Sequence, residues 1–331
     1  MNQSFDPGTG NWGPLVLAAT MENPAYLALH PSLPRLYAVS ESPQSKVSAY
    51  TINTNQTLTP LGERPSGGAA ACHLSVDATG RFLFIAHYSS GTLARFGLDP
   101  MGALDESPLL FSLSGSGPHP QRQQKPHAHF VAQSPDNRFT YLCDLGSDRV
   151  WIFPFQPDSS ALTPAPLPPA LTPAGSGPRH LAFHPTLPLL YVNNELNPGV
   201  SVFSRDTETG ALALKQTLAS LPGKLDPTWS TAQIVCHPNG RWLYLSNRVH
   251  NSISLFHIAT DGTLRLHKVQ AISEETPRHI TLDPSGTWLL CAGQTNHQIR
   301  AYPLHPESGE LGKPNDPLRV PVPVCLLFHR N

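Results

Sequence analysis

The sequence predicts an all-β fold, a seven-bladed β-propeller, from three observations. One pattern of short apolar runs and turn residues recurs six times along the 331 residues. The chain holds 36 prolines and 24 glycines, which is too many chain-breaking residues for long helices. The apolar runs are short and rich in Val, Leu, Ile, Phe and Tyr, as strands are. We therefore expect a single domain over residues 1–331, with the blade shared by the two termini incomplete.

Each copy of the repeat contains a turn such as His-Pro or Asp-Pro, an apolar run, a polar loop and a second apolar run. The copies begin at His30, Val76, Ser134, His184, His237 and Asp283. A short apolar run precedes each copy and another follows several of them, so each copy predicts four strands, named a to d. Periods of roughly 40–50 residues with four strands indicate propeller blades. The alternative, a β-sandwich, does not need a constant period.

Three segments depart from the repeat. Residues 154–178 are rich in proline, and we expect an exposed excursion there because the repeat continues on both sides; a linker between domains is the alternative. Residues 13–20 predict a strand d, and residues 321–329 predict a strand a. Together they would form a seventh blade shared by both chain ends, which pairs exposed edges. Strands b and c of this blade are missing, so we expect it to be incomplete.

Composition and charge exclude several classes of protein. Lys and Arg number 22 against 23 Asp and Glu, without any run of like charges, so no nucleic-acid partner is expected. No apolar stretch reaches the roughly 18 residues of a membrane helix, and the first residues lack the features of a secretory signal. The five cysteines are widely spaced and indicate neither a disulfide framework nor a zinc ribbon. We expect a cytoplasmic protein, and the oligomeric state is left open.

Polar residues gather at one end of the predicted blades. In an up-and-down blade the start of strand a and the end of strand b lie at the same end, so these positions converge on one face. Before or at strand a lie His73, His127, His129, Arg179, His180, Arg278 and His279. After strand b lie Glu41, Tyr88, Asp144, Asn193, Asn194, Glu195, Asn247, Arg248 and Gln294. This concentration predicts a binding site near the mouth of the central channel.

Three arginines suggest the charge of the ligand. Arg179, Arg248 and Arg278 keep their charge at all ordinary pH values and present planar donor forks, which suit carboxylate or phosphate groups. The alternative is that each arginine pairs with a neighbouring acid in a structural ion pair. Glu195 lies among these cations and should stay ionised, as a base or as a group that orients a histidine.

Two histidines are candidates for proton transfer. His127 and His129 are two residues apart, so in an extended stretch both side chains lie on one face. They are interpreted as a metal pair, as one general base plus one substrate contact, or as core histidines. Spacing names no third or fourth ligand, so we expect neither metal nor cofactor. In contrast, His30, His184 and His237 precede proline at the opposite end of the blades and are expected to be structural.

The segments GSGPRHLAFHP (175–185) and YVNNEL (191–196) resemble the lactonase family of seven-bladed propellers. That family includes the cycloisomerase-type 6-phosphogluconolactonases and the carboxy-cis,cis-muconate lactonising enzyme. Residues 127–148, 237–253 and 276–294 support the resemblance, which extends from about Phe5 to the C-terminus. The chain departs from the family in lacking its usual first two strands. It also carries SNRVHNSI, where a form like SNRGHDSI is more usual.

The resemblance implies hydrolysis of a sugar-acid lactone, 6-phosphogluconolactone, in the oxidative pentose phosphate route. It implies catalytic roles for His129, Arg179, Glu195 and Arg248. We expect the small anionic substrate to be bound by His127, His180, Asn194, Arg278, His279 and Gln294, with its phosphate held by Arg278 or else by Lys125. Three alternatives stay open: a muconate-type lactonising enzyme, a metal-dependent propeller lactonase, and a binding propeller without catalysis.

Overall fold

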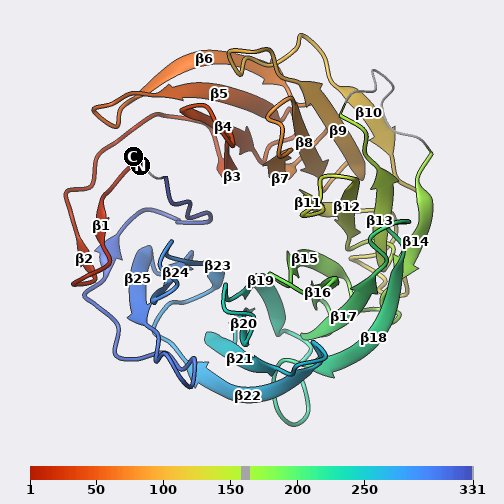
Figure 1. Ribbon diagram of the computed structural model, residues 1–331, viewed down its shortest axis with the longest axis vertical. Coiled ribbons are helices and arrows are strands. Elements are labelled where there is room, and N and C mark those ends of the chain that lie inside the picture. Colours follow the sequence, from red (N-terminus) through yellow and green to blue (C-terminus); the bar gives the residue numbers. More distant parts are fainter. Residues whose placement is uncertain (158–164, 330–331) are drawn as a thin grey trace. The chain divides into compact units, whose positions relative to one another are not determined.

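The computed structural model of the protein describes residues 1–157 and 165–329, and its regular elements are strands (Figure 1). Within these residues, six four-stranded antiparallel sheets and one two-stranded sheet are present. The chain divides into two compact units. We call Leu17–Pro178, Asp206–Ala211 and His329–Asn331 the N-proximal unit, and Met1–Val16, Arg179–Arg205 and Leu212–Phe328 the C-proximal unit. The single domain over residues 1–331 stays a prediction.

The N-proximal unit contains three blades, each a meander in which sequential strands pair antiparallel. The strands are β3 (Pro24–Leu29), β4 (Arg35–Ser40), β5 (Lys46–Ile52) and β6 (Leu58–Pro65); β7 (Ala71–Val76), β8 (Phe82–His87), β9 (Thr92–Gly97) and β10 (Leu109–Ser112); β11 (Ala128–Gln133), β12 (Phe139–Asp144), β13 (Arg149–Pro154) and β14 (Leu167–Leu171). The predicted excursion at 154–178 therefore contains the fourth strand of its blade, and residues 158–164 lie outside the described residues.

The C-proximal unit contains the other three blades and the two-stranded sheet. Its strands are β15 (Pro178–Phe183), β16 (Leu189–Asn194), β17 (Gly199–Arg205) and β18 (Leu212–Ala219); β19 (Ser230–Cys236), β20 (Trp242–Arg248), β21 (Ser252–Ile258) and β22 (Leu264–Ala271); β23 (Pro277–Leu282), β24 (Trp288–Gly293), β25 (Gln298–Pro303) and β26 (Leu318–Arg319); β1 (Phe5–Asp6) and β2 (Asn11–Trp12). The predicted strands a to d thus correspond to the four strands of each blade.

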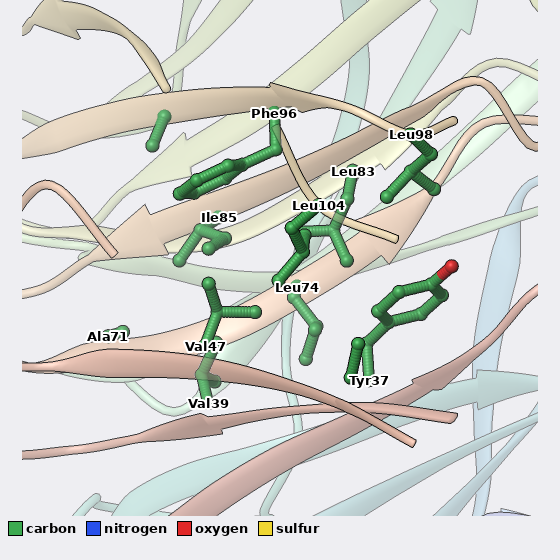
Figure 2. Packing of buried hydrophobic residues seen from close by; sticks show 12 residues of the cluster. Tyr37, Val39, Val47, Ala71, Leu74, Leu83, Ile85, Phe96, Leu98 and Leu104 are labelled. Atoms are coloured by element: carbon green, nitrogen blue, oxygen red, sulfur yellow. The ribbon is translucent and has the colours of Figure 1, made fainter. Parts of the chain in front are cut away.

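In a blade that lies between two others of its unit, the central strands are apolar on both faces because the blade packs against a neighbour on either side. In β8, Leu83 and Ile85 belong to the cluster shared with the preceding blade, whereas Phe84 and Ala86 belong to the cluster shared with the following blade. Figure 2 shows the first of these clusters, to which Leu83, Ile85 and Val47 belong. Alternation of side chains along a strand makes this possible, and it explains the continuous apolar runs of the repeat.

The His-Pro histidines join the turn between strands a and b to the same turn of the next blade. The ring of His30 accepts a hydrogen bond from the backbone N–H of Leu33 and lies 3.0 Å from the carbonyl of Gly80 through Nε2. His184 and His237 make the same contact with the next blade in the C-proximal unit. The structural role that the sequence predicts for these three histidines matches these contacts.

A tyrosine in strand b makes a second contact between blades. The hydroxyl of Tyr191 donates to the carbonyl of Gly262 at 3.0 Å, and Tyr244 donates to Gly309 at 2.7 Å. In the N-proximal unit Tyr37 and Tyr141 donate to glycine carbonyls in the same manner. These rings are buried, so each hydroxyl gives a hydrogen bond to a carbonyl group that water cannot reach.

The N-terminal residues form a small hairpin that covers one face of the last blade. The indole of Trp288 donates to the carbonyl of Pro7, and the Phe5 ring contacts Trp288 edge-on, with the ring centroids 5.8 Å apart. Gly10 lies against the Trp288 ring with a positive φ of 74°, a position where a Cβ would meet the indole at 2.4 Å. Trp12 and Leu15 pack against the core of the same blade.

The prediction of strands at 13–20 and 321–329 is wrong. Val16 makes only an isolated bridge, with Asn2, so the chain folds back on its own beginning. Residues 321–329 form no strand because Pro321 and Pro323 have no N–H to donate and Val322 has a positive φ of 46°. The incomplete terminal blade is accordingly represented, in the described residues, by the two-stranded sheet. Among these residues no helix is long and apolar enough to cross a membrane.

The tyrosine contact predicts a measurable contribution to stability. Tyr191→Phe removes the hydroxyl and leaves the Gly262 carbonyl buried without its donor. We expect the free energy of unfolding to fall by about 1–2 kcal/mol in urea titrations. Phe84 occupies the corresponding position of the second blade, so the ring alone is compatible with the fold. An unchanged urea midpoint would contradict this role.

Candidate active site

A recurring bulge places the second residue of strand a out of the regular register. The ladder between strands a and b shifts around Ala25, Cys72, His129 and Arg278, and around Ala232 with Gln233. A bulge leaves one residue unpaired and redirects its side chain, and it is common beside functional sites. His129 and Arg278 are therefore presented by backbone irregularity rather than by the alternation of a straight strand.

Arg179, Glu195 and Arg248 form the centre of the site in the C-proximal unit. Nε of Arg179 lies 2.8 Å from Oε2 of Glu195, and Nη2 of Arg248 lies 3.1 Å from the same oxygen. Arg179 and Glu195 are each 2% exposed, whereas the Arg248 side chain is 15% exposed. The sequence alternative of arginines paired with an acid thus describes these two, but they share one carboxylate. The cluster keeps a net positive charge, and Arg248 is the arginine within reach of solvent.

Backbone carbonyls and a buried amide fix the two guanidinium groups. Arg179 donates to the carbonyl of Ala232 at 2.5 Å, and Arg248 donates to that of Thr231 at 3.0 Å. The side-chain amide of Asn193 donates to the hydroxyl of Thr231 at 2.7 Å and accepts from the backbone N–H of His180 at 2.9 Å. These bonds join the ends of β15, β16 and β19, so the positions of the charges are set by the blades themselves.

One donor of Arg248 has no protein partner. Its Nε is buried and forms no hydrogen bond with any of the described residues. A buried N–H without a partner costs free energy, which a bound acceptor would recover. This nitrogen therefore marks the point of the cluster where an oxygen of a ligand can bind.

Two buried histidines, His180 and His279, lie beside Arg179. Nε2 of His180 lies 3.1 Å from Nη1 of Arg179, a contact that requires this nitrogen to accept. Burial, and next the charge of Arg179, lower the pKa of His279 to about 3. Its Nδ1 accepts from the backbone N–H of Leu326. His279 therefore adds no positive charge to the site at neutral pH.

His127 and His129 lie in the N-proximal unit around the ring of Tyr88. The His127 ring stacks on Tyr88 with the ring centroids 4.4 Å apart, and the buried His129 ring meets it edge-on at 5.7 Å. Nδ1 of His127 lies 2.8 Å from the carbonyl of Tyr88. Asp144 accepts from the backbone N–H of His127 at 2.7 Å, which fixes the entry to β11. The convergence of His129 with the arginines stays a prediction.

The remaining predicted residues occupy the same ends of their blades. Asn194 is buried and binds the Ser201 hydroxyl at 3.1 Å, so it supports the end of β16. Arg278 and Gln294 are half-buried at the start of β23 and just after β24. Lys125 is exposed and donates to the carbonyl of Ser89.

Two residues that the sequence does not single out, Thr231 and Arg122, lie beside predicted ones. Thr231 joins Asn193 to the backbone of Asn194 through its hydroxyl. Arg122 binds the Tyr88 hydroxyl through Nε and Nη2 at 3.2 and 3.0 Å. Both lie outside recognisable motifs, although Arg122 belongs to a segment, 107–135, without a single Asp or Glu. In residues 1–157 and 165–329, no three His, Cys, Asp or Glu side chains gather in a way that could hold a metal ion.

The blades and the site together are those of a β-propeller family. A family model described as "Lactonase, 7-bladed beta-propeller" matches residues 2–328. The chain therefore belongs to the lactonase family of seven-bladed β-propellers, and the all-β propeller prediction is confirmed.

Three bacterial proteins are similar to this chain over almost its whole length. The 6-phosphogluconolactonase of Bacillus subtilis is 30% identical over 320 residues, covering 94% of this chain and 89% of that protein. The 6-phosphogluconolactonase of Cronobacter sakazakii is 32% identical over 305 residues, covering 91% and 87%. The structure of a periplasmic gluconolactonase of Pseudomonas aeruginosa superposes with a TM-score of 0.91 at 27% identity, covering 97% and 92%.

Burial of two histidines predicts acid sensitivity. Burial lowers the pKa of His87 to about 4, and His279 has its pKa at about 3. In the unfolded chain an imidazole titrates near 6.5, so below that pH the unfolded state binds protons that the folded state does not. Stability should therefore fall as the pH drops from 6.5 towards 4, by up to about 1.4 kcal/mol per pH unit for each histidine. Urea unfolding at pH 7, 6 and 5 measures this, and an imidazole NMR titration of His279 near pH 6.5 would contradict it.

The shared carboxylate predicts a large loss on neutralisation. Glu195→Gln leaves two guanidinium groups, one of them fully buried, without their counter-charge. We expect the free energy of unfolding to fall by about 3–5 kcal/mol, measured by urea titration. Glu63→Gln is the matched control, because its ion pair with Lys46 is exposed and should contribute a small fraction of this. Equal effects of the two substitutions would contradict the role given to Glu195.

Proposed function

We propose that this protein hydrolyses 6-phosphogluconolactone to 6-phosphogluconate, the lactone-opening step of the oxidative pentose phosphate pathway. Family membership supports lactonase chemistry, and the two relatives named 6-phosphogluconolactonase support this substrate. The net positive charge of the Arg179–Glu195–Arg248 cluster suits a substrate that is anionic and that develops further negative charge.

The observation that carries the proposal is the buried Nε of Arg248. It is an N–H donor on a permanent cation, held in place by Glu195 and by the carbonyl of Thr231. Such a preorganised donor stabilises the oxyanion formed when water adds to the lactone carbonyl, an effect of about 3–4 kcal/mol for one good donor.

The reaction needs one proton to move twice. In the proposal, neutral His129 takes a proton from water as the oxygen attacks the carbonyl carbon and forms the tetrahedral intermediate. The bond between the carbonyl carbon and the ring oxygen then breaks, and protonated His129 returns the proton to that oxygen. Glu195 accepts from two guanidinium groups, so in the proposal it positions Arg179 and Arg248.

The test is the clearance of freshly made 6-phosphogluconolactone above its spontaneous hydrolysis. We expect His129→Ala to lower kcat by about 10²-fold or more, because it removes the general base. The control is His305→Ala, an exposed histidine at the end of the blade opposite the site, which should keep wild-type kcat.

Three outcomes would contradict the proposal or parts of it. If the wild-type protein does not accelerate opening of 6-phosphogluconolactone, the proposed function is wrong. A muconate-type lactonising activity, or ligand binding without catalysis, would then remain as the alternative. Full activity of His129→Ala removes the histidine from proton transfer. Activity lost with a strong chelator and restored by a divalent cation would favour the metal-dependent alternative over the expected metal-free site.

Cytoplasmic location stays a prediction, to be measured by cell fractionation.

A further inference from the structure

The loop that joins β10 to β11, residues 113–127, is clamped between the b–c turns of two blades in the N-proximal unit. Gly91 has a positive φ of 62°, and a Cβ there would lie 2.7 Å from the carbonyl oxygen of Pro126. A Cβ on Gly146 would lie 1.9 Å from the carbonyl oxygen of Lys125. The turns therefore approach the loop so closely that neither glycine position can carry a side chain without displacing it.

A buried glutamine fixes the shape of the loop. Gln123 is 0% exposed, and its amide donates to the carbonyl of Leu145 at 2.9 Å and to Asp148 at 2.7 Å. Its side-chain oxygen accepts from the backbone N–H of His119 at 3.0 Å. The residues on either side of Gln123 are consequently held in one conformation relative to the third blade.

Three basic side chains of this loop converge on two consecutive residues, Tyr88 and Ser89. Arg122 donates from Nε and Nη2 to the Tyr88 hydroxyl, and Lys125 donates to the carbonyl of Ser89 at 2.7 Å. His127 stacks on the Tyr88 ring and contacts its carbonyl through Nδ1. The phenol holds the guanidinium in position, so a ligand would bind without first ordering a flexible arginine.

The segment that carries these side chains has no acid of its own. Between residues 107 and 135 there is no Asp or Glu, whereas Arg122 and Lys125 each add a positive charge. The neighbouring carboxylates of the b–c turn are buried and serve the backbone. Asp144 accepts from His127 and Gly146 N–H groups, and Asp148 accepts from those of Gly175 and Gly177.

We propose that Arg122, Lys125 and His127 form a subsite for the phosphate ester of the substrate, and that this subsite selects phosphorylated over unphosphorylated lactones. A phosphate dianion presents three acceptor oxygens and matches one guanidinium, one ammonium and one imidazole donor. Tyr88 links the subsite to His129, whose ring meets the tyrosine edge. This inference rests on the proposed function, because it assigns the substrate's distal charge to a defined place.

The test compares 6-phosphogluconolactone with unphosphorylated glucono-δ-lactone in the full-length protein. Arg122→Gln, Lys125→Gln and the double variant should raise KM for the phosphorylated lactone by about 10-fold or more, since each loses a charge-assisted bond. KM for the unphosphorylated lactone should change less than about 2-fold, because that substrate has no phosphate to lose. The preference of the wild type should also shrink as salt is raised, since an exposed lysine contributes to it.

Lys215→Gln is the matched control, because Lys215 is likewise an exposed lysine that donates to a backbone carbonyl, that of Asp261. It should leave KM for both lactones at the wild-type value. Equal changes of KM for the two lactones in the Arg122 and Lys125 variants would overturn the subsite, as would no change at all.

Calorimetric binding of 6-phosphogluconate and gluconate separates this inference from the proposed function. If the wild type opens neither lactone, the proposed function fails by itself. The subsite then still predicts that 6-phosphogluconate binds the wild type about 10-fold or more tightly than it binds the double variant, with gluconate unaffected. Equal affinities of 6-phosphogluconate for the two proteins would overturn the subsite whatever the catalytic result.

Discussion

The site depends on one buried carboxylate that holds two arginines. Oε2 of Glu195 lies within 3.1 Å of both the Arg179 and Arg248 guanidinium groups, almost without access to water. Burying three charges costs desolvation energy, which the two short contacts and the bonds to the carbonyls of Ala232 and Thr231 offset. The cluster keeps one excess positive charge, and Arg248 is the more exposed of its two arginines. A structural ion pair would be complete, whereas here one donor of Arg248 remains for a ligand.

The blades provide the rigid frame that such a cluster requires. Blades of one unit pack against each other through their central strands. In the blades that begin with β3, β15 and β19, a histidine and a tyrosine also join the blade to the next one at the end opposite the site. With that end fixed, the residues around the start of strand a and the end of strand b can vary in chemistry. Those positions hold Arg179 and Glu195 in one blade and Arg248 in the next. Repetition thus supplies equivalent positions, and substitution at them supplies the chemistry.

Much of the fold could be predicted from the sequence because every copy of the repeat forms the same four-stranded sheet. The period locates the blades, and proline after His30, His184 and His237 locates the turns that these histidines stabilise. The chain ends could not be predicted in this way. Residues 13–20 and 321–329 have the apolar composition of strands, but backbone pairing decides whether a strand forms, and their prolines and the N-terminal hairpin leave them without a partner strand.

The sequence shows which types of residue stand at the candidate site, but it does not show which of their side chains contact one another. Arginine, histidine and glutamate at the ends of strands a and b indicate an anionic ligand, but the sequence does not show that Glu195 serves two arginines at once. The bulges also could not be predicted, since the apolar pattern of the sequence continues through them. Arg122 lies in a loop without periodicity, and only its contact with Tyr88 places it near the predicted histidines.

The most direct measurement is kcat of Arg248→Gln for opening of 6-phosphogluconolactone at saturating substrate, with Arg248→Lys beside it. Glutamine removes the guanidinium charge and its Nε donor, while lysine keeps a charge but loses the planar fork. The account predicts that kcat falls by about 10²–10³-fold for glutamine and by less for lysine. Wild-type kcat in a correctly folded Arg248→Gln protein would contradict the claim that this arginine stabilises the reacting lactone.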